Sequence, residues 1–133
     1  MKFKTLICLC LLAALLCPMA LCVEVSARSA ALYDPDTGRF LYEKNAGEQL
    51  PMASTTKIMT ALLVLESMEL DQVVKVRPEY LRTEGSSMYL AAGEEVRVET
   101  LLSGLLLLSG SDAAKTLAAA CAGSEEAFVE RMN

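Results

Sequence analysis

The sequence predicts an α/β (α+β) fold in which short antiparallel strands accompany a group of apolar helices. Two strand-like runs flank a segment rich in turn-forming residues around position 36. Two long apolar segments, over residues 53–66 and 99–108, have the length of core helices, and two shorter runs alternate apolar with charged residues. Alternation with a period of two indicates strands, whereas apolar runs of about ten residues or more favour helices.

The first predicted element is a β-hairpin. Residues 29–33 and 39–43 are the strand-like runs, and residues 34–38 between them have the turn-forming sequence Asp-Pro-Asp-Thr-Gly. The glycine stands where a left-handed backbone conformation is often required. Because two strands cannot form a covered sheet by themselves, we expect this hairpin to join a larger antiparallel sheet.

A helix is predicted next, over residues 53–66, and a small ribbon follows it. Apolar side chains cover nearly every face of this helix, so we expect it to be buried. Residues 73–76 and 95–98 alternate apolar and charged side chains, which is typical of two short paired strands.

Three further helices are expected in the rest of the chain. Residues 99–108 are too short for a membrane span and suit a core helix. A third helix is predicted over residues 113–122 and is broken at Gly123. A fourth begins near Glu125, with Ser124 as its cap and acidic residues at the positive end of the helix dipole.

The fourth helix has barely begun when the sequence ends at Asn133. Three of its apolar side chains have no evident packing partner in the pattern: Phe128, Val129 and Met132. We therefore expect the sequence to be the N-terminal part of a longer domain.

Residues 1–27 predict an export signal. Two early lysines precede an apolar core over residues 6–16, and Ala27 ends a small-residue pattern typical of a cleavage site. The alternative is an uncleaved membrane anchor, because residues 5–23 are close to the length that spans a bilayer. With cleavage, residues 28–133 remain as an exported, extracytoplasmic chain, either secreted or held at the cell envelope.

Charge and composition argue against several classes of function. The chain has 12 basic and 17 acidic residues and a net charge of -5, with scattered charges and few aromatic residues. Nucleic acid is therefore not an expected partner. A zinc site is not expected either, because the chain has no histidine and four of its five cysteines lie in the predicted export signal.

Ser54 and Lys57, at the start of the first predicted helix, have the clearest chemical potential. A Ser-His-Asp triad is unavailable in a sequence without histidine, and lysine is then the remaining group to take the proton of a serine nucleophile. On a helix, residues three apart lie on one face, so Oγ and Nζ can come within hydrogen-bonding reach. Free N–H groups of the first turn can stabilise an oxyanion. The alternative is that Ser54 only caps the helix.

Ser109 and Ser111 follow the second apolar segment. Serine at such a place is usually a turn or capping residue. If this turn meets Ser54 and Lys57 in one cleft, Ser109 can instead relay a proton, because a hydroxyl both donates and accepts hydrogen bonds.

Several segments resemble the low-molecular-mass penicillin-binding proteins, the serine-type D-alanyl-D-alanine carboxypeptidases of peptidase family S11. Residues 51–62 closely resemble the nucleophile segment of that family, with its Ser-x-x-Lys motif. The resemblance continues through residues 85–88 and 101–114 and ends with residues 128–133. It implies a penicillin-binding-protein or serine β-lactamase-like fold, with residues 28–133 as the N-terminal part of the catalytic domain.

The resemblance also implies a reaction and the residues that perform it. Ser54 resembles the nucleophile that forms the acyl-enzyme, Lys57 the proton acceptor, and Ser109 the serine of the family's Ser-x-Asn motif. The family reaction removes the terminal D-alanine from peptidoglycan stem pentapeptides in cell-wall biogenesis, and β-lactams inhibit it by acylating the same serine. No metal or organic cofactor is implied, and association with the membrane is left open.

The sequence departs from the family pattern at two places. Ser111 stands where the family has asparagine, and a hydroxyl cannot supply both the carbonyl and the amide donors of that residue. The family's Lys-Thr-Gly strand would lie beyond Asn133, and losing one oxyanion donor costs about a hundred- to a thousandfold in turnover. We therefore expect the chain as written to be inactive or nearly so.

Two other functions stay open at this point. A serine β-lactamase would share Ser54 and Lys57 but would need a group that activates water for deacylation. A non-catalytic peptidoglycan-binding protein would agree with Ser111 and with the missing strand.

Overall fold

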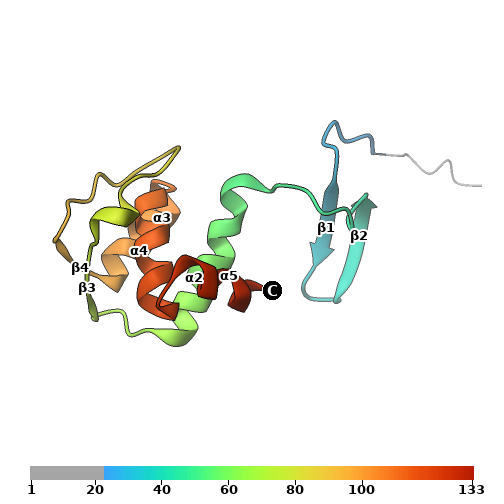
Figure 1. Cartoon of the computed structure of the whole chain (residues 1–133). Helices are drawn as coiled ribbons and strands as arrows, with labels where there is room; N and C mark the ends of the chain where they lie inside the picture. The colour runs from blue at the N-terminus through green and yellow to red at the C-terminus, as the bar shows by residue number, and fades with distance from the viewer. Residues whose placement is uncertain (1–22) are drawn as a thin grey trace, which may run out of the picture. The chain divides into compact units, whose positions relative to one another are not determined.

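The computed structural model describes residues 23–133, which divide into two compact units between Gln49 and Leu50 (Figure 1). The core of the predicted export signal and the alternative membrane anchor lie outside the described residues, apart from the last positions of each. Within residues 23–133, no helix is both long enough and apolar enough to cross a membrane. The assignment of residues 28–133 to one catalytic domain stays a prediction.

The N-terminal unit contains the predicted hairpin as a two-stranded sheet, so the larger antiparallel sheet expected around it is not formed among the described residues. β1 (Ala30–Asp34) pairs antiparallel with β2 (Arg39–Lys44), and the register is irregular between Leu32 and Tyr33. Asp34 stabilises the turn by accepting hydrogen bonds from the Asp36 N–H at 3.0 Å and from the Thr37 hydroxyl at 2.6 Å. These contacts are local, which explains why the turn sequence predicts the hairpin correctly.

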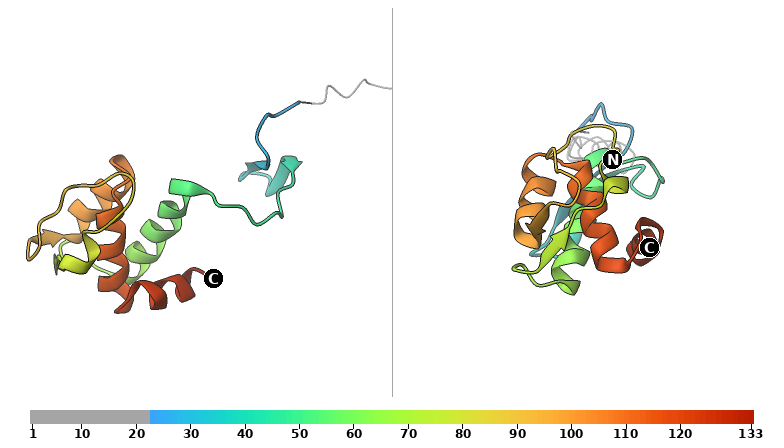
Figure 2. Two further views of the ribbon diagram at one scale, coloured as in Figure 1. Left: turned by 45° about the horizontal axis from the view of Figure 1, so that its top comes forward. Right: turned by 60° about the vertical axis from the view of Figure 1, so that its left-hand side comes forward.

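The C-terminal unit is mainly helical (Figure 2). Its helices are α2 (Thr56–Ser67), α3 (Val98–Leu107), α4 (Ser111–Ala122) and α5 (Glu125–Met132). The predicted ribbon is also present, because β3 (Val73–Lys75) pairs antiparallel with β4 (Glu95–Arg97). Two short 3₁₀ turns complete the unit, η1 (Ala53–Thr55) before α2 and η2 (Pro78–Tyr80) after β3.

The core of this unit surrounds α4, which contacts α2, α3 and α5. Leu101, Leu117 and Phe128 are almost fully buried, from α3, α4 and α5 respectively. The expectation that the apolar residues of the last helix lack a packing partner is wrong for Phe128, because α5 turns back onto the core after Gly123, whose φ is 88°. Met132 packs partly against the same core, whereas Val129 is 49% exposed. The predicted cap is confirmed, because the Ser124 side chain accepts a hydrogen bond from the Ala127 N–H at 3.1 Å.

The expectation that the first helix is buried on all sides is wrong for the described structure. Only one side of α2 packs against the core, through the buried residues Thr60, Ala61 and Val64. Four large apolar side chains on α2 are 42–64% exposed: Ile58, Met59, Leu62 and Leu65. Apolar residues on every face do not indicate which face packs, and here α3, α4 and α5 all contact α2.

Candidate active site

The predicted site residues meet in one cavity of about 400 Å³ in the helical unit. Ser54 and Lys57 come from η1 and the first turn of α2, and Ser109 and Ser111 come from the junction of α3 and α4. The segment before Ser87 forms a further part of the lining, through Glu84, Gly85 and Ser86. The three predicted catalytic residues and Ser111 therefore share one cavity, although they come from two segments more than 50 positions apart in the sequence.

Ser54 lies inside the 3₁₀ turn and is exposed. The N-cap of this turn is Met52, and no side chain caps it, so the structure does not use Ser54 as a cap. The preceding residue, Ala53, has a φ of 50°, a left-handed conformation that costs an alanine on the order of 1 kcal/mol or more. Strain of this kind is often found where a functional side chain has to be held in one direction.

Lys57 is half-buried and its ammonium group faces three oxygen atoms. Nζ donates to the backbone carbonyl of Ser109 at 2.6 Å, to the Ser109 hydroxyl at 2.9 Å and to the Ser111 hydroxyl at 3.4 Å. A lysine ammonium has three donors and no acceptor, so these contacts match its full hydrogen-bonding capacity.

Ser109 connects the lysine to the serine of the Ser-x-x-Lys motif. Its hydroxyl accepts from Lys57 and donates to Ser54 Oγ at 2.8 Å. Among the hydrogen bonds of the described residues, Lys57 thus reaches Ser54 through Ser109 and not directly. Ser109 also has a left-handed φ of 56°, and Gly110 rather than a serine occupies the N-cap of α4 without a side-chain cap. The serines of this junction therefore contact Lys57 instead of capping the helix.

A comparison with protein-family models shows which family the chain belongs to. The Peptidase_S11 model, described as D-alanyl-D-alanine carboxypeptidase, matches residues 17–133. The chain belongs to this carboxypeptidase family. The match includes all four residues of the cavity that the sequence singles out.

Individual carboxypeptidases agree with this assignment. The chain is 41% identical over 112 residues to the D-alanyl-D-alanine carboxypeptidase DacF of Bacillus subtilis (strain 168), a match that covers 80% of this chain and 29% of the relative. Its fold is similar to that of the D-alanyl-D-alanine carboxypeptidase DacD from Francisella tularensis, with a TM-score of 0.77, 34% identity and coverage of 84% and 28%. For penicillin binding protein 5 from Haemophilus influenzae the TM-score is 0.78, the identity 27% and the coverage 86% and 36%. The predicted penicillin-binding-protein fold is thus confirmed, while the chain spans little more than a third of these relatives at most.

Asp112 follows Ser111 directly but does not line the cavity, and its residue type in the sequence does not indicate what its side chain contacts. Its side chain is buried and accepts hydrogen bonds from the segment that follows Ser86. The sequence shows only an acid in the first turn of a helix, which is an ordinary surface position. Burial raises the pKa of Asp112, but hydrogen bonds from the Ser87 hydroxyl and from backbone N–H groups outweigh it and hold the pKa below its usual value.

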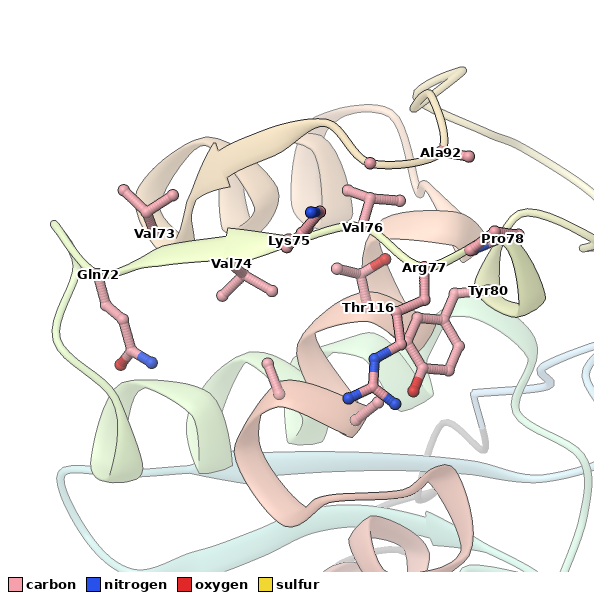
Figure 3. Close-up of a pocket in the computed structure, with 13 residues that line it drawn as sticks. Gln72, Val73, Val74, Lys75, Val76, Arg77, Pro78, Tyr80, Ala92 and Thr116 are labelled. Carbon is pink, nitrogen blue, oxygen red and sulfur yellow. The ribbon is translucent and has the colours of Figure 1, made fainter.

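A second, larger cavity lies between β3 and α4 (Figure 3). It has a volume of about 670 Å³, and Val74, Val76, Arg77, Tyr80 and Thr116 are among its lining residues. It shares no lining residue with the cavity at Ser54, and it lacks a serine and lysine pair. The chemistry of the Ser-x-x-Lys motif is therefore confined to the smaller cavity.

Proposed function

We propose that this protein is a serine-type D-alanyl-D-alanine carboxypeptidase. Ser54 Oγ attacks the carbonyl carbon of the penultimate D-alanine of a peptidoglycan stem pentapeptide, the terminal D-alanine leaves, and water then hydrolyses the ester on Ser54. The hydrogen-bonded chain from Lys57 Nζ through Ser109 Oγ to Ser54 Oγ is the observation that supports this proposal most directly. Family membership supports it independently.

In the structure the hydrogen bonds of this chain run from the Lys57 ammonium to Ser109 and from Ser109 to Ser54. The proposed proton path follows the same atoms in the opposite sense and starts with the Lys57 amine in its neutral form. Ser54 gives its proton to the Ser109 oxygen as Oγ attacks, while Ser109 gives its own proton to the neutral amine of Lys57. The resulting ammonium returns a proton through Ser109 to the nitrogen of the leaving D-alanine. A hydroxyl suits this relay because it accepts one proton and donates another. General acid and base assistance of this kind contributes about a hundred- to ten-thousandfold in rate.

Export is part of the proposal and is supported by residues 1–27. A carboxypeptidase acting on peptidoglycan has to work outside the cytoplasm, and the lysines and the apolar run at the start of the chain are typical of an export signal. The alternative is that residues 5–23 are not cleaved and anchor the protein in the membrane. Cell fractionation tests both, because the cleaved chain is expected outside the cytoplasm and shorter than the translated one.

The experiment that tests the function uses the protein encoded by the complete reading frame that contains this sequence. We expect fluorescent penicillin to label Ser54, as identified by mass spectrometry of the labelled peptide, and a pentapeptide to release D-alanine. Ser54→Ala is expected to abolish both signals, and Lys57→Ala is expected to reduce acylation by at least about a thousandfold. Labelling of a residue other than Ser54 would falsify the assignment. A matched control is Lys115→Ala, because Lys115 contacts Glu125 at 3.7 Å instead of lining the cavity.

A serine β-lactamase is the second candidate, and one observation favours testing it. Glu84 is the carboxylate among the described residues that line the cavity at Ser54. A carboxylate there can activate water for hydrolysis of a β-lactam acyl-enzyme. Glu84→Gln distinguishes the two functions: a β-lactamase loses deacylation of the penicilloyl enzyme, whereas we expect the carboxypeptidase to retain its slow deacylation and its release of D-alanine.

A further inference from the structure

Asp112 joins two segments that both line the cavity at Ser54. It lies in the first turn of α4, directly after Ser111, and only 1% of its surface is exposed. Its carboxylate accepts from the Ser87 hydroxyl at 2.6 Å, from the Met88 N–H at 2.9 Å and from the Leu90 N–H at 3.2 Å. A buried carboxylate with this many donors holds them firmly, since charged hydrogen bonds are stronger than neutral ones.

The segment bound by Asp112 continues directly into the wall of the cavity. The carbonyl of Ser86 accepts from the Ser111 N–H at 2.8 Å, while the Ser111 hydroxyl lies 3.4 Å from Lys57 Nζ. Ser86 and Gly85 themselves line the cavity. Asp112 directly follows Ser111 and its partner Ser87 directly follows Ser86, so the carboxylate's hydrogen bond lies next to the bond between Ser111 and Ser86.

The same segment is also packed tightly against α3. The side chain of Met88 occupies the space beside Gly104, where an added Cβ would lie 1.8 Å from Met88 Sδ. The N–H of Gly110 in turn donates to the Gly104 carbonyl at 3.1 Å. Residues 85–90 therefore have little freedom to move while Asp112 holds them, and neither has the turn that carries Ser109.

We propose that Asp112 is a positioning residue, whose carboxylate fixes residues 85–90 against the first turn of α4 and thereby sets the placement of Ser109 and Ser111 around Lys57. Asp112 touches neither Ser54 nor Lys57 among its described hydrogen bonds, so it acts through these neighbours. This inference rests on the proposed function, because its effect on chemistry is measured as acylation of Ser54.

The test compares Asp112→Ala and Asp112→Asn with Glu126→Gln, which changes a carboxylate that lies in the first turn of α5 and does not line the cavity. Acylation by a fluorescent penicillin is measured on the protein encoded by the complete reading frame, at saturating reagent and per active site. Misplacement by about 1 Å can cost a hundredfold in rate, so we expect a reduction of roughly 10- to 100-fold in Asp112→Ala. Asp112→Asn should be partly rescued, because its carbonyl still accepts an N–H, and Glu126→Gln should match the wild type.

Hydrogen exchange provides the readout that does not depend on activity. The amides of Met88 and Leu90 should exchange faster in both Asp112 variants, while amides in α5 should be unaffected. A general structural role would instead lower the melting temperature and leave the acylation rate per active site unchanged, and this outcome would overturn the proposal. Ser87→Ala removes only the hydroxyl donor and should give a smaller change in the same direction, so the test stands even if Asp112→Ala fails to fold.

The proposed function and the positioning role of Asp112 are contradicted by different results. If the wild type is not acylated at Ser54, the proposed function fails, and exchange at Met88 and Leu90 still shows whether Asp112 holds the segment. The positioning role alone fails under a different set of results. In that case the wild type is acylated at Ser54, and Asp112→Asn and Ser87→Ala match it both in acylation rate at saturating penicillin and in amide exchange at Met88 and Leu90.

Discussion

The hairpin over residues 30–44 and the helical unit over residues 50–133 are stabilised in different ways. In the hairpin, the turn hydrogen bonds join residues two and three positions apart, and the large apolar side chains Leu32 and Leu41 are 56% and 62% exposed. In the helical unit, core side chains are almost fully buried, and the hydrogen bonds of the candidate site join residues 52 and 55 positions apart. Local chemistry therefore determines the hairpin, whereas tertiary packing determines the site.

The two units should differ most in the free energy of unfolding that is lost when a leucine is replaced by alanine. Leu101→Ala removes a side chain that is fully buried at the centre of the helical unit, and we expect it to lower the free energy of unfolding by about 2–5 kcal/mol. Leu41→Ala removes an exposed side chain of the hairpin and should change stability by no more than about 0.5 kcal/mol. Urea unfolding followed by the helical circular dichroism signal measures the effect of Leu101→Ala, and hydrogen exchange of the amides in β1 and β2 measures that of Leu41→Ala. Similar losses in the two variants would contradict the contrast.

A pair of glycines gives the next largest effect. A Cβ at Gly104 would lie 1.8 Å from Met88 Sδ, whereas a Cβ at Gly47, in the N-terminal unit, would meet nothing within 4 Å. In the protein encoded by the complete reading frame, we expect Gly104→Ala to displace Met88 and to destabilise the helical unit by about 1–3 kcal/mol. It should also slow acylation of Ser54, because residues 85–90 must shift. Gly47→Ala should change neither quantity.

The double variant Gly104→Ala with Met88→Ala checks the cause of that effect. Removing the Met88 side chain makes room for the new methyl group, so part of the lost stability should return relative to Met88→Ala alone. The measurement is a double-mutant cycle on urea unfolding. Strictly additive losses would show that the two side chains do not compete for the same space.

The same contrast explains which parts of the molecule the sequence can predict. Turn composition and apolar periodicity are local signals, and they predict the hairpin, the ribbon, the helices and the Ser124 cap correctly. They do not predict the exposed side of α2 or the burial of Phe128, because both depend on how helices pack against one another. A helix that is apolar all round carries no information about which face meets the core.

The sequence predicts which residues form the candidate site but not which of them form hydrogen bonds with one another. Ser54, Lys57 and Ser109 follow from the chemistry of a serine nucleophile in a chain without histidine and from the family resemblance, and their catalytic roles stay predictions. The spacing of Ser54 and Lys57 indicates a direct contact, but the 3₁₀ turn and the left-handed Ala53 place the serine outside the regular helix, where it meets Ser109. Asp112 has no sequence signal of its own, because its partners lie 22 to 25 positions away.

The smallest expected effect is a pH dependence that differs between the two units. The pKa of Asp112 and that of Asp34 both lie below the ordinary value of 3.8. For Asp112, burial raises the pKa, and hydrogen bonds from Ser87 and three backbone N–H groups more than offset this; for Asp34, the Thr37 hydroxyl is the main cause. When folding depresses the pKa of a carboxyl, the unfolded state binds more protons, so the stabilisation is complete above the ordinary pKa and is lost as the pH falls through the folded-state value.

We therefore expect the helical unit of the wild type to lose stability as the pH falls below about 4, and Asp112→Asn to lose less over the same interval because it has no carboxylate to protonate. Urea midpoints from the helical circular dichroism signal, taken across the acid range, measure the difference. Asp34→Asn is the matched control, since its carboxylate stabilises only the turn of the hairpin, and its acid curve should follow that of the wild type. Parallel acid curves for the wild type and Asp112→Asn would show that the charge of the buried carboxylate does not stabilise the helical unit. The difference between the hairpin, held by local hydrogen bonds, and the site, held by tertiary contacts, would then depend on packing alone.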